Sequence, residues 1–193
     1  ADYSFHRAGN LLAVTDNNLS NGDNGTDTLS NVEYLQFSDQ LISTANSPPT
    51  GSVSLTGAGT ESQVLTVSNM LADADGLGAF SYQWQRSSDS GATWNNISSA
   101  FNTTYTLGTA DVGYLVRVVA SYTDGFGTAE AASSSASALI LGFKSGTNAD
   151  DVIQGSFYHD TLDGLAGNDT LQGGGGNDTL DGGTDSDTAD YSS

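Results

Sequence analysis

The chain has 193 residues and carries 23 Asp and Glu against 4 Lys and Arg, which gives a formal net charge of −19. A surface this acidic excludes nucleic acid as a partner and disfavours anionic membranes. Cysteine is absent, which excludes disulfides and thiolate metal sites, and no apolar run approaches the roughly 18 residues that membrane insertion needs. Thr-, Ser- and Val-rich alternation with almost no helical periodicity predicts an all-β fold.

Residues 1–45 mix short apolar strands with a loop rich in Asn, Gly and Asp. The stretch DYSFHRAGNLLAVTDNN predicts two strands around a turn at Ala8-Gly9-Asn10. It is followed by the nine residues GDNGTDTLS from Gly22, in which Asp27 is sixth and an apolar residue is eighth. A further strand, NVEYLQF, completes the segment.

Residues 46–141 alternate as the strands of a β-sandwich do, after a linker at Pro48-Pro49 that cannot join a strand ladder. Trp84 stands where an immunoglobulin-type sandwich buries a tryptophan. The pattern YQWQRSSDSGATWNNI followed by TTYTLGTADVGYLVRVVASYTDGFGTAEA resembles bacterial Ig-like domains of large surface proteins, although Leu115 and Arg117 replace the tyrosine and cysteine of antibody domains. The predicted strands are 52–55, 64–67, 81–86, 93–97, 104–107, 115–122 and 128–131.

Two features of this middle segment have alternative interpretations. The sequence Asp73-Ala74-Asp75-Gly76 can hold Ca²⁺ in a turn, but a hydrogen-bonded turn without a metal explains the same spacing. Tyr82, Trp94 and Tyr105 can form a carbohydrate platform, or they can simply pack in the core and across strands.

Residues 142–193 contain a repeat with a period of nine. Its blocks are GTNADDVIQ from Gly146, then GSFYHDTLD, GLAGNDTLQ, GGGGNDTLD and GGTDSDTAD. The sixth position of every block is an aspartate: Asp151, Asp160, Asp169, Asp178 and Asp187. The eighth position is always apolar: Ile153, Leu162, Leu171, Leu180 and Ala189. A disordered acidic linker has no reason to keep this phase, so the repeats predict a folded element.

Nine residues suit a half-coil, in which a glycine-rich turn of about six residues precedes a short strand whose eighth position points inward. Two blocks then complete one coil, so the aspartates form two rows, with Asp151, Asp169 and Asp187 in one and Asp160 and Asp178 in the other. Unit charges on coils about 4.8 Å apart repel by about 3–4 kcal/mol at an effective dielectric of about 20. The coil therefore needs a cation. Ca²⁺ fits, since it accepts six to eight oxygens at flexible angles, whereas Mg²⁺ demands a small octahedral shell.

These blocks resemble the RTX, or hemolysin-type, nonapeptide, which folds as a parallel β-roll around Ca²⁺. The resemblance implies that a site takes its sixth-position Asp and two carbonyls from each of two turns on the same side. The implied sites are Gly146, Asn148, Asp151, Leu165, Gly167 and Asp169; then Gly155, Phe157, Asp160, Gly174, Gly176 and Asp178; and finally Gly164, Ala166, Asp169, Gly183, Asp185 and Asp187. Asp185 departs from the glycine that the family has at position four.

The resemblance extends to the N-terminal segment, where GDNGTDTLS makes Asp27 a further candidate calcium ligand. The letters ADYS open the chain and recur near its end, which predicts an internal piece of a longer protein that repeats this unit. The expected architecture is therefore all-β. A segment at 1–45 closes an RTX roll, an Ig-like β-sandwich occupies 46–141, and a parallel RTX β-roll that binds calcium occupies 142–193.

The resemblance also implies a function. We expect a calcium-dependent structural extender of an adhesin-like bacterial protein, exported by type I secretion and folding outside the cell or on its surface. The alternative is an accessory region of a secreted RTX enzyme, such as a peroxidase or protease. Neighbouring repeat units of the parent chain are the expected partners, with a cell-surface ligand reached through other domains as a further candidate. His6 and His159 lie in unrelated segments and no hydrolase motif is present, so we expect no catalysis.

Overall fold

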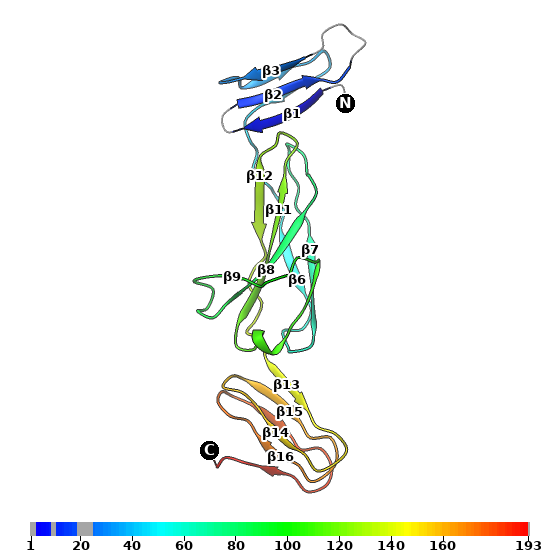
Figure 1. The fold of residues 1–193 in the computed structure, drawn as a ribbon, viewed down its shortest axis with the longest axis vertical. Helices are drawn as coiled ribbons and strands as arrows, with labels where there is room; N and C mark the ends of the chain where they lie inside the picture. The colour runs from blue at the N-terminus through cyan, green and yellow to red at the C-terminus, as the bar shows by residue number, and fades with distance from the viewer. Residues whose placement is uncertain (1–2, 9–10, 19–24, 193) are drawn as a thin grey trace. The chain divides into compact units, whose positions relative to one another are not determined.

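The computed structural model describes residues 3–8, 11–18 and 25–192, and strands make up nearly all of its regular structure (Figure 1). One short 3-10 helix, η1 (Thr109–Asp111), occurs in these ranges, and no helix there is long or apolar enough to cross a membrane. The prediction of an all-β fold is confirmed. The chain divides into two compact units. They are Ala1–Val53, Asn69–Ser81 and Val119–Ser133 for the first, and Ser54–Ser68, Tyr82–Val118 and Ser134–Ser193 for the second.

The first unit begins with an antiparallel sheet of β1 (Tyr3–Ala8), β2 (Leu11–Asp16) and β3 (Thr26–Leu29), in that order. The two strands predicted from the sequence are present as β1 and β2, although residues 9–10 of their turn lie outside the described residues. A hairpin of β4 (Tyr34–Gln36) and β5 (Leu41–Ser43) follows. Arg7 donates a hydrogen bond to the carbonyl oxygen of Thr44, which ties β1 to the end of the hairpin.

The middle of the chain forms two sheets with the strand orders β10-β7-β6 and β12-β11-β8-β9. Their strands are β6 (Val53–Thr56), β7 (Val64–Asn69), β8 (Ser81–Ser87), β9 (Asn95–Asn96), β10 (Thr104–Thr106), β11 (Leu115–Thr123) and β12 (Ala129–Ser133). Each predicted strand is present with ends shifted by at most about two residues, the usual uncertainty of strand boundaries.

Trp84 of β8 is fully buried, and its ring centroid lies 5.3 Å from that of Tyr105 in β10. This contact joins the two sheets and confirms the buried tryptophan expected from the sequence. Because Tyr105 packs inward, the packing interpretation of this aromatic is favoured over a carbohydrate platform. Beside it lies Asp111, which is 1% exposed and accepts hydrogen bonds from the Tyr105 hydroxyl at 2.7 Å and the Gly108 N–H at 3.0 Å.

The second unit ends in a parallel roll (Figure 1). Two parallel sheets, β13-β15-β17 and β14-β16-β18, make up its walls. The strands are β13 (Gly142–Ser145), β14 (Val152–Gln154), β15 (Asp160–Asp163), β16 (Thr170–Gln172), β17 (Thr179–Asp181) and β18 (Thr188–Ala189). Ile153 lies opposite Leu171, and Leu162 opposite Leu180, so two nonapeptides form one coil as predicted. Ile153, Leu162 and Leu171 form a buried core against which Leu180 packs.

Candidate metal centre

The roll brings the sixth-position aspartates into the two rows expected from their spacing. In one row the Asp151 N–H donates to Asp169 Oδ1 at 2.8 Å, and the Asp169 N–H donates to Asp187 Oδ1 at 3.0 Å. In the other row the Asp160 N–H donates to Asp178 Oδ1, also at 3.0 Å. The backbone of one coil therefore fixes one carboxylate oxygen of the next coil, and the second oxygen, Oδ2, is left for another partner.

Asp169 shows what that partner must be. Its side chain is 1% exposed, and Oδ2 is buried without a hydrogen-bond partner among the described residues. An ionised oxygen in this position costs several kcal/mol unless a cation or a proton compensates it. The surrounding donors are carboxylate and carbonyl oxygens, and the chain has no cysteine, so a hard cation of the Ca²⁺ type fits this site.

Glycine at the first position of each turn makes room for these oxygens. A Cβ on Gly146 would lie 2.8 Å from the carbonyl oxygen of Gly164 and 3.0 Å from Asp151 Oδ2. A Cβ on Gly164 would likewise meet the carbonyl oxygen of Gly182 and Asp169 Oδ2. Carboxylate and carbonyl oxygens thus converge at a point where only glycine fits, which is the ligand arrangement that Ca²⁺ uses.

The first two turns satisfy their aspartates with protein donors. Thr147 donates its N–H at 2.6 Å and its hydroxyl at 2.8 Å to Asp151 Oδ2, and Ser156 donates the same pair of groups to Asp160 Oδ2. The hydrogen bonds from the backbone and side chain of Thr147 lower the pKa of Asp151 below its ordinary value. This contribution was missed by the sequence analysis. The available signal was the hydroxyl residue at position two, present only in the first two blocks.

The other predicted ligands are backbone groups of the same stacked turns. Gly167 lies over the backbone of Ala149, and Gly176 over that of Tyr158, so turns two blocks apart do meet. Turns three to five share a left-handed backbone at positions two and four: Leu165, Gly167, Gly174, Gly176, Gly183 and Asp185. The remaining ligands implied by the resemblance belong to the same three pairs of turns: Asn148, Gly155, Phe157 and Ala166. Asp185, the departure noted above, accepts a hydrogen bond from the Gly167 N–H at 3.3 Å.

Asp27 does not belong to this stack. It is exposed on β3, where the antiparallel register places it opposite Val14. Residues 22–24 of its nonapeptide lie outside the described residues. Its role as a calcium ligand stays a prediction.

Replacing Leu165 by Gly should stabilise the roll by about 0.5–1 kcal/mol, because Leu165 has a φ of +74° that costs an L side chain but not glycine. Its side chain is 41% exposed, so little burial is lost. Gly174→Ala at the matched position of the next block should act in the opposite direction, since a Cβ there would overlap the carbonyl oxygen of Ser156. Urea unfolding at fixed Ca²⁺ measures both, and a destabilised Leu165→Gly would contradict the expectation.

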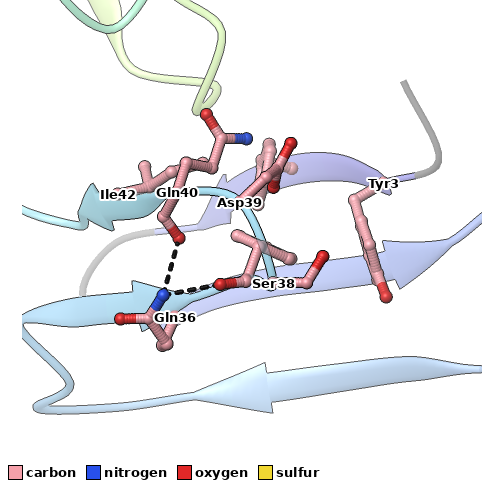
Figure 2. A pocket seen from close by; sticks show the side chains of 8 residues that line it. Tyr3, Gln36, Ser38, Asp39, Gln40 and Ile42 are labelled. Carbon is pink, nitrogen blue, oxygen red and sulfur yellow. Dashed lines mark hydrogen bonds between the residues drawn. The ribbon is translucent and has the colours of Figure 1, made fainter.

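A pocket in the first unit is a separate candidate site (Figure 2). Tyr3 and Phe37 lie in it with their ring centroids 4.8 Å apart. The Gln36 side-chain amide donates to the carbonyl oxygens of Phe37 and Gln40, so it closes the β4–β5 turn. The lining residues are Tyr3, Phe5, Gln36, Phe37, Ser38, Asp39, Gln40 and Ile42. Packing and turn closure account for these contacts, and we assign the pocket no ligand.

Comparison with known proteins agrees with the geometry of the roll. The family described as the RTX calcium-binding nonapeptide repeat (4 copies) matches residues 145–180 and 155–189. A family described as a domain of unknown function (DUF8696) matches residues 50–141. No curated protein matches the chain at a significant level. RTX repeats indicate calcium binding in a secreted bacterial protein. Residues 145–189 of this chain are therefore calcium-binding RTX nonapeptide repeats.

Proposed function

We propose that the chain is a calcium-dependent structural module, an extender of a secreted, adhesin-like protein that is exported by the type I route. The observation that carries the proposal is the buried, unpartnered Oδ2 of Asp169 within a row of stacked aspartates. A roll built this way is stable where Ca²⁺ is abundant, as outside the cell, and unstable where it is scarce.

The proposed organisation has three segments. Residues 46–141 act as an Ig-like sandwich and spacer, which the buried Trp84 between two sheets supports. Residues 142–193 act as the calcium-folded roll. Residues 1–45 close a roll, since the antiparallel β1-β2-β3 sheet cannot extend a parallel coil in register. The partners proposed for both ends are neighbouring repeat units of the parent chain.

We propose no catalytic role for this chain. His159 Nδ1 is engaged with the backbone of Asn177, which suits a structural role in the second turn of the roll. The competing proposal is an accessory region of a secreted RTX enzyme whose catalytic domain lies elsewhere in the parent protein. The parent gene decides between them, because many copies of this unit favour an extender and a single enzymatic domain favours the alternative.

Calcium titration of metal-stripped protein tests the proposed module. Far-UV circular dichroism should show a gain of β signal as Ca²⁺ is raised to the millimolar range typical of extracellular modules. The double variant Asp169→Ala, Asp178→Ala should show no such gain, because each row loses a carboxylate. Mg²⁺ at the same concentration serves as the control cation and should have little effect. An equal gain in both proteins, or none in either, would mean that the repeats are a passive acidic linker.

A further inference from the structure

Three acidic side chains from distant parts of the sequence meet in the first unit, outside the RTX repeats. Asp73 precedes β8, Asp124 lies in the turn between β11 and β12, and Glu130 lies on β12. One carboxylate oxygen from each lies within 4.8 Å of the other two. Asp73 is far in sequence from Asp124 and Glu130, so local chain geometry does not by itself bring the three acids together.

The β11–β12 turn holds Asp124 in a fixed orientation. Its side chain is 6% exposed, and Oδ1 accepts the N–H groups of Phe126 at 2.9 Å and Thr128 at 2.7 Å. Oδ2 is buried and has no hydrogen-bond partner among the described residues, and the same holds for Thr128 Oγ1. Two buried oxygens at one turn are therefore left without a partner, beside two further carboxylates. Burial of such oxygens is unfavourable unless something compensates them.

Neutral donors orient the other two carboxylates but do not neutralise them. The Asp75 N–H donates to Asp73 Oδ1 at 2.8 Å, and the Tyr122 hydroxyl donates to Asp73 Oδ2. Asn46 Nδ2 donates to Glu130 Oε1 at 2.7 Å. In the described part of the chain, no ion pair to Lys, Arg or His involves any of the three acids.

The cluster therefore concentrates negative charge in a partly buried position. A cation is the counterpart that its three carboxylates and the unpartnered Asp124 Oδ2 lack among the described residues.

We propose that Asp73, Asp124 and Glu130 form a calcium site separate from the RTX repeats. Oxygens bound to one Ca²⁺ at 2.3–2.6 Å can lie up to about 5 Å apart, so the 4.8 Å limit on their separation fits a shared ion. An all-oxygen donor set disfavours Zn²⁺, and Mg²⁺ takes more waters and a smaller octahedral shell.

The site uses the Asp73-Ala74-Asp75-Gly76 sequence differently from a simple calcium turn. Asp75 faces the linker, where its carboxylate accepts the Ser47 N–H at 2.6 Å and the Ser47 hydroxyl at 3.4 Å. Only Asp73 contributes to the cluster. Asp75 is therefore the matched control, an acid from the same turn whose oxygens already have protein donors.

The test counts bound Ca²⁺ in the full chain by native mass spectrometry and isothermal titration calorimetry. Asp124→Asn keeps Oδ1 as the acceptor for the turn and replaces Oδ2 with an amide, so the chain should bind one Ca²⁺ fewer. Glu130→Gln is the second variant, for use if Asp124→Asn fails to fold. It changes a half-exposed strand position and should lower the calcium affinity of the same site by at least about tenfold. Asp75→Asn should bind as many ions as the unmodified chain.

A second readout separates a metal from a shared proton. Without Ca²⁺, Asp124→Asn should melt at a higher temperature than the unmodified chain, because it removes repulsion, and with Ca²⁺ the order should reverse. An equal number of ions and equal affinity in Asp124→Asn and the unmodified chain would overturn the proposal. So would stabilisation by mild acid with no effect of Ca²⁺, which indicates a protonated carboxyl. The roll variant Asp169→Ala, Asp178→Ala should lose only Ca²⁺ ions bound by the RTX repeats. The number of ions lost in each variant therefore distinguishes the roll sites from the proposed site.

Discussion

Asp169→Asn should raise the calcium concentration at the midpoint of roll folding by at least about tenfold, equivalent to about 1.4 kcal/mol or more. Asp169 is the central member of its row: its Oδ1 accepts from Asp151, its N–H donates to Asp187, and its Oδ2 is buried without a partner among the described residues. The amide preserves the shape and one acceptor but cannot offer a second anionic oxygen to the ion. Circular dichroism during a calcium titration measures the midpoint.

The control for this variant is Asp163→Asn. Asp163 lies on β15 and pairs across the parallel sheet with Ser145 and Asp181, away from the turns. Asp163→Asn removes one negative charge from the roll, as Asp169→Asn does. A general effect of net charge would therefore shift the calcium midpoints of both variants equally. We expect the midpoint of Asp163→Asn to stay within about twofold of that of the unmodified chain, because Asp163 is half-exposed on a strand and a solvent-screened charge there contributes only a few tenths of a kcal/mol. Equal shifts in both variants would refute a specific ligand role for Asp169.

Asp111→Ala should lower the free energy of unfolding of the middle sheets by about 3 kcal/mol, with or without Ca²⁺. Asp111 is the buried last residue of η1 and accepts three hydrogen bonds, from the Tyr105 hydroxyl, the Gly108 N–H and Arg86 Nη1, the last at 3.2 Å. Its removal leaves buried donors without an acceptor and opens a small cavity. Chemical denaturation followed by tryptophan fluorescence measures the loss, because Trp84 packs against Tyr105.

Tyr105→Phe calibrates that result. It deletes one of the three hydrogen bonds and keeps the ring against Trp84, so we expect a loss of about 1 kcal/mol. If the middle sheets and the roll fold independently, a calcium titration should give the same midpoint of roll folding for both variants. If Asp111→Ala cost no more than Tyr105→Phe, the buried carboxylate would not be the centre of this network.

Local periodicity explains which parts of the fold could be predicted from the sequence. Every eighth-position residue of the roll is apolar and recurs at a constant spacing, so the period alone was enough to assign Leu162 and Leu171 to one core. The isolated nonapeptide containing Asp27 has the same pattern but lies in an antiparallel sheet. A single repeat cannot bury its apolar residue without a stacked partner, so pairing with β2 decides its structure.

The acidic cluster of the first unit could not be predicted in the same way. Asp73 and Glu130 come from different segments, and no spacing rule relates them. Sequence reasoning singled out Asp73 and Asp75 together, as a turn that either holds Ca²⁺ or is closed by hydrogen bonds alone. It passed over Asp124, which resembles an ordinary hairpin residue beside Gly125. Contacts between distant segments depend on how the strands are ordered in space, which pattern analysis does not supply.

In the first two turns of the roll, a hydroxyl side chain donates to the sixth-position aspartate, and this has a consequence for the order of folding. Thr147 and Ser156 satisfy Asp151 and Asp160 without an ion, and the ring of Tyr158 covers Gly113 so closely that a Cβ there would overlap it. The first coil can thus form on protein contacts alone and serve as a nucleus. Later coils then add one after another along the chain, and each is stabilised when its Ca²⁺ binds. The slowest step of roll folding, which is the closure of the first loop, therefore does not depend on the calcium concentration.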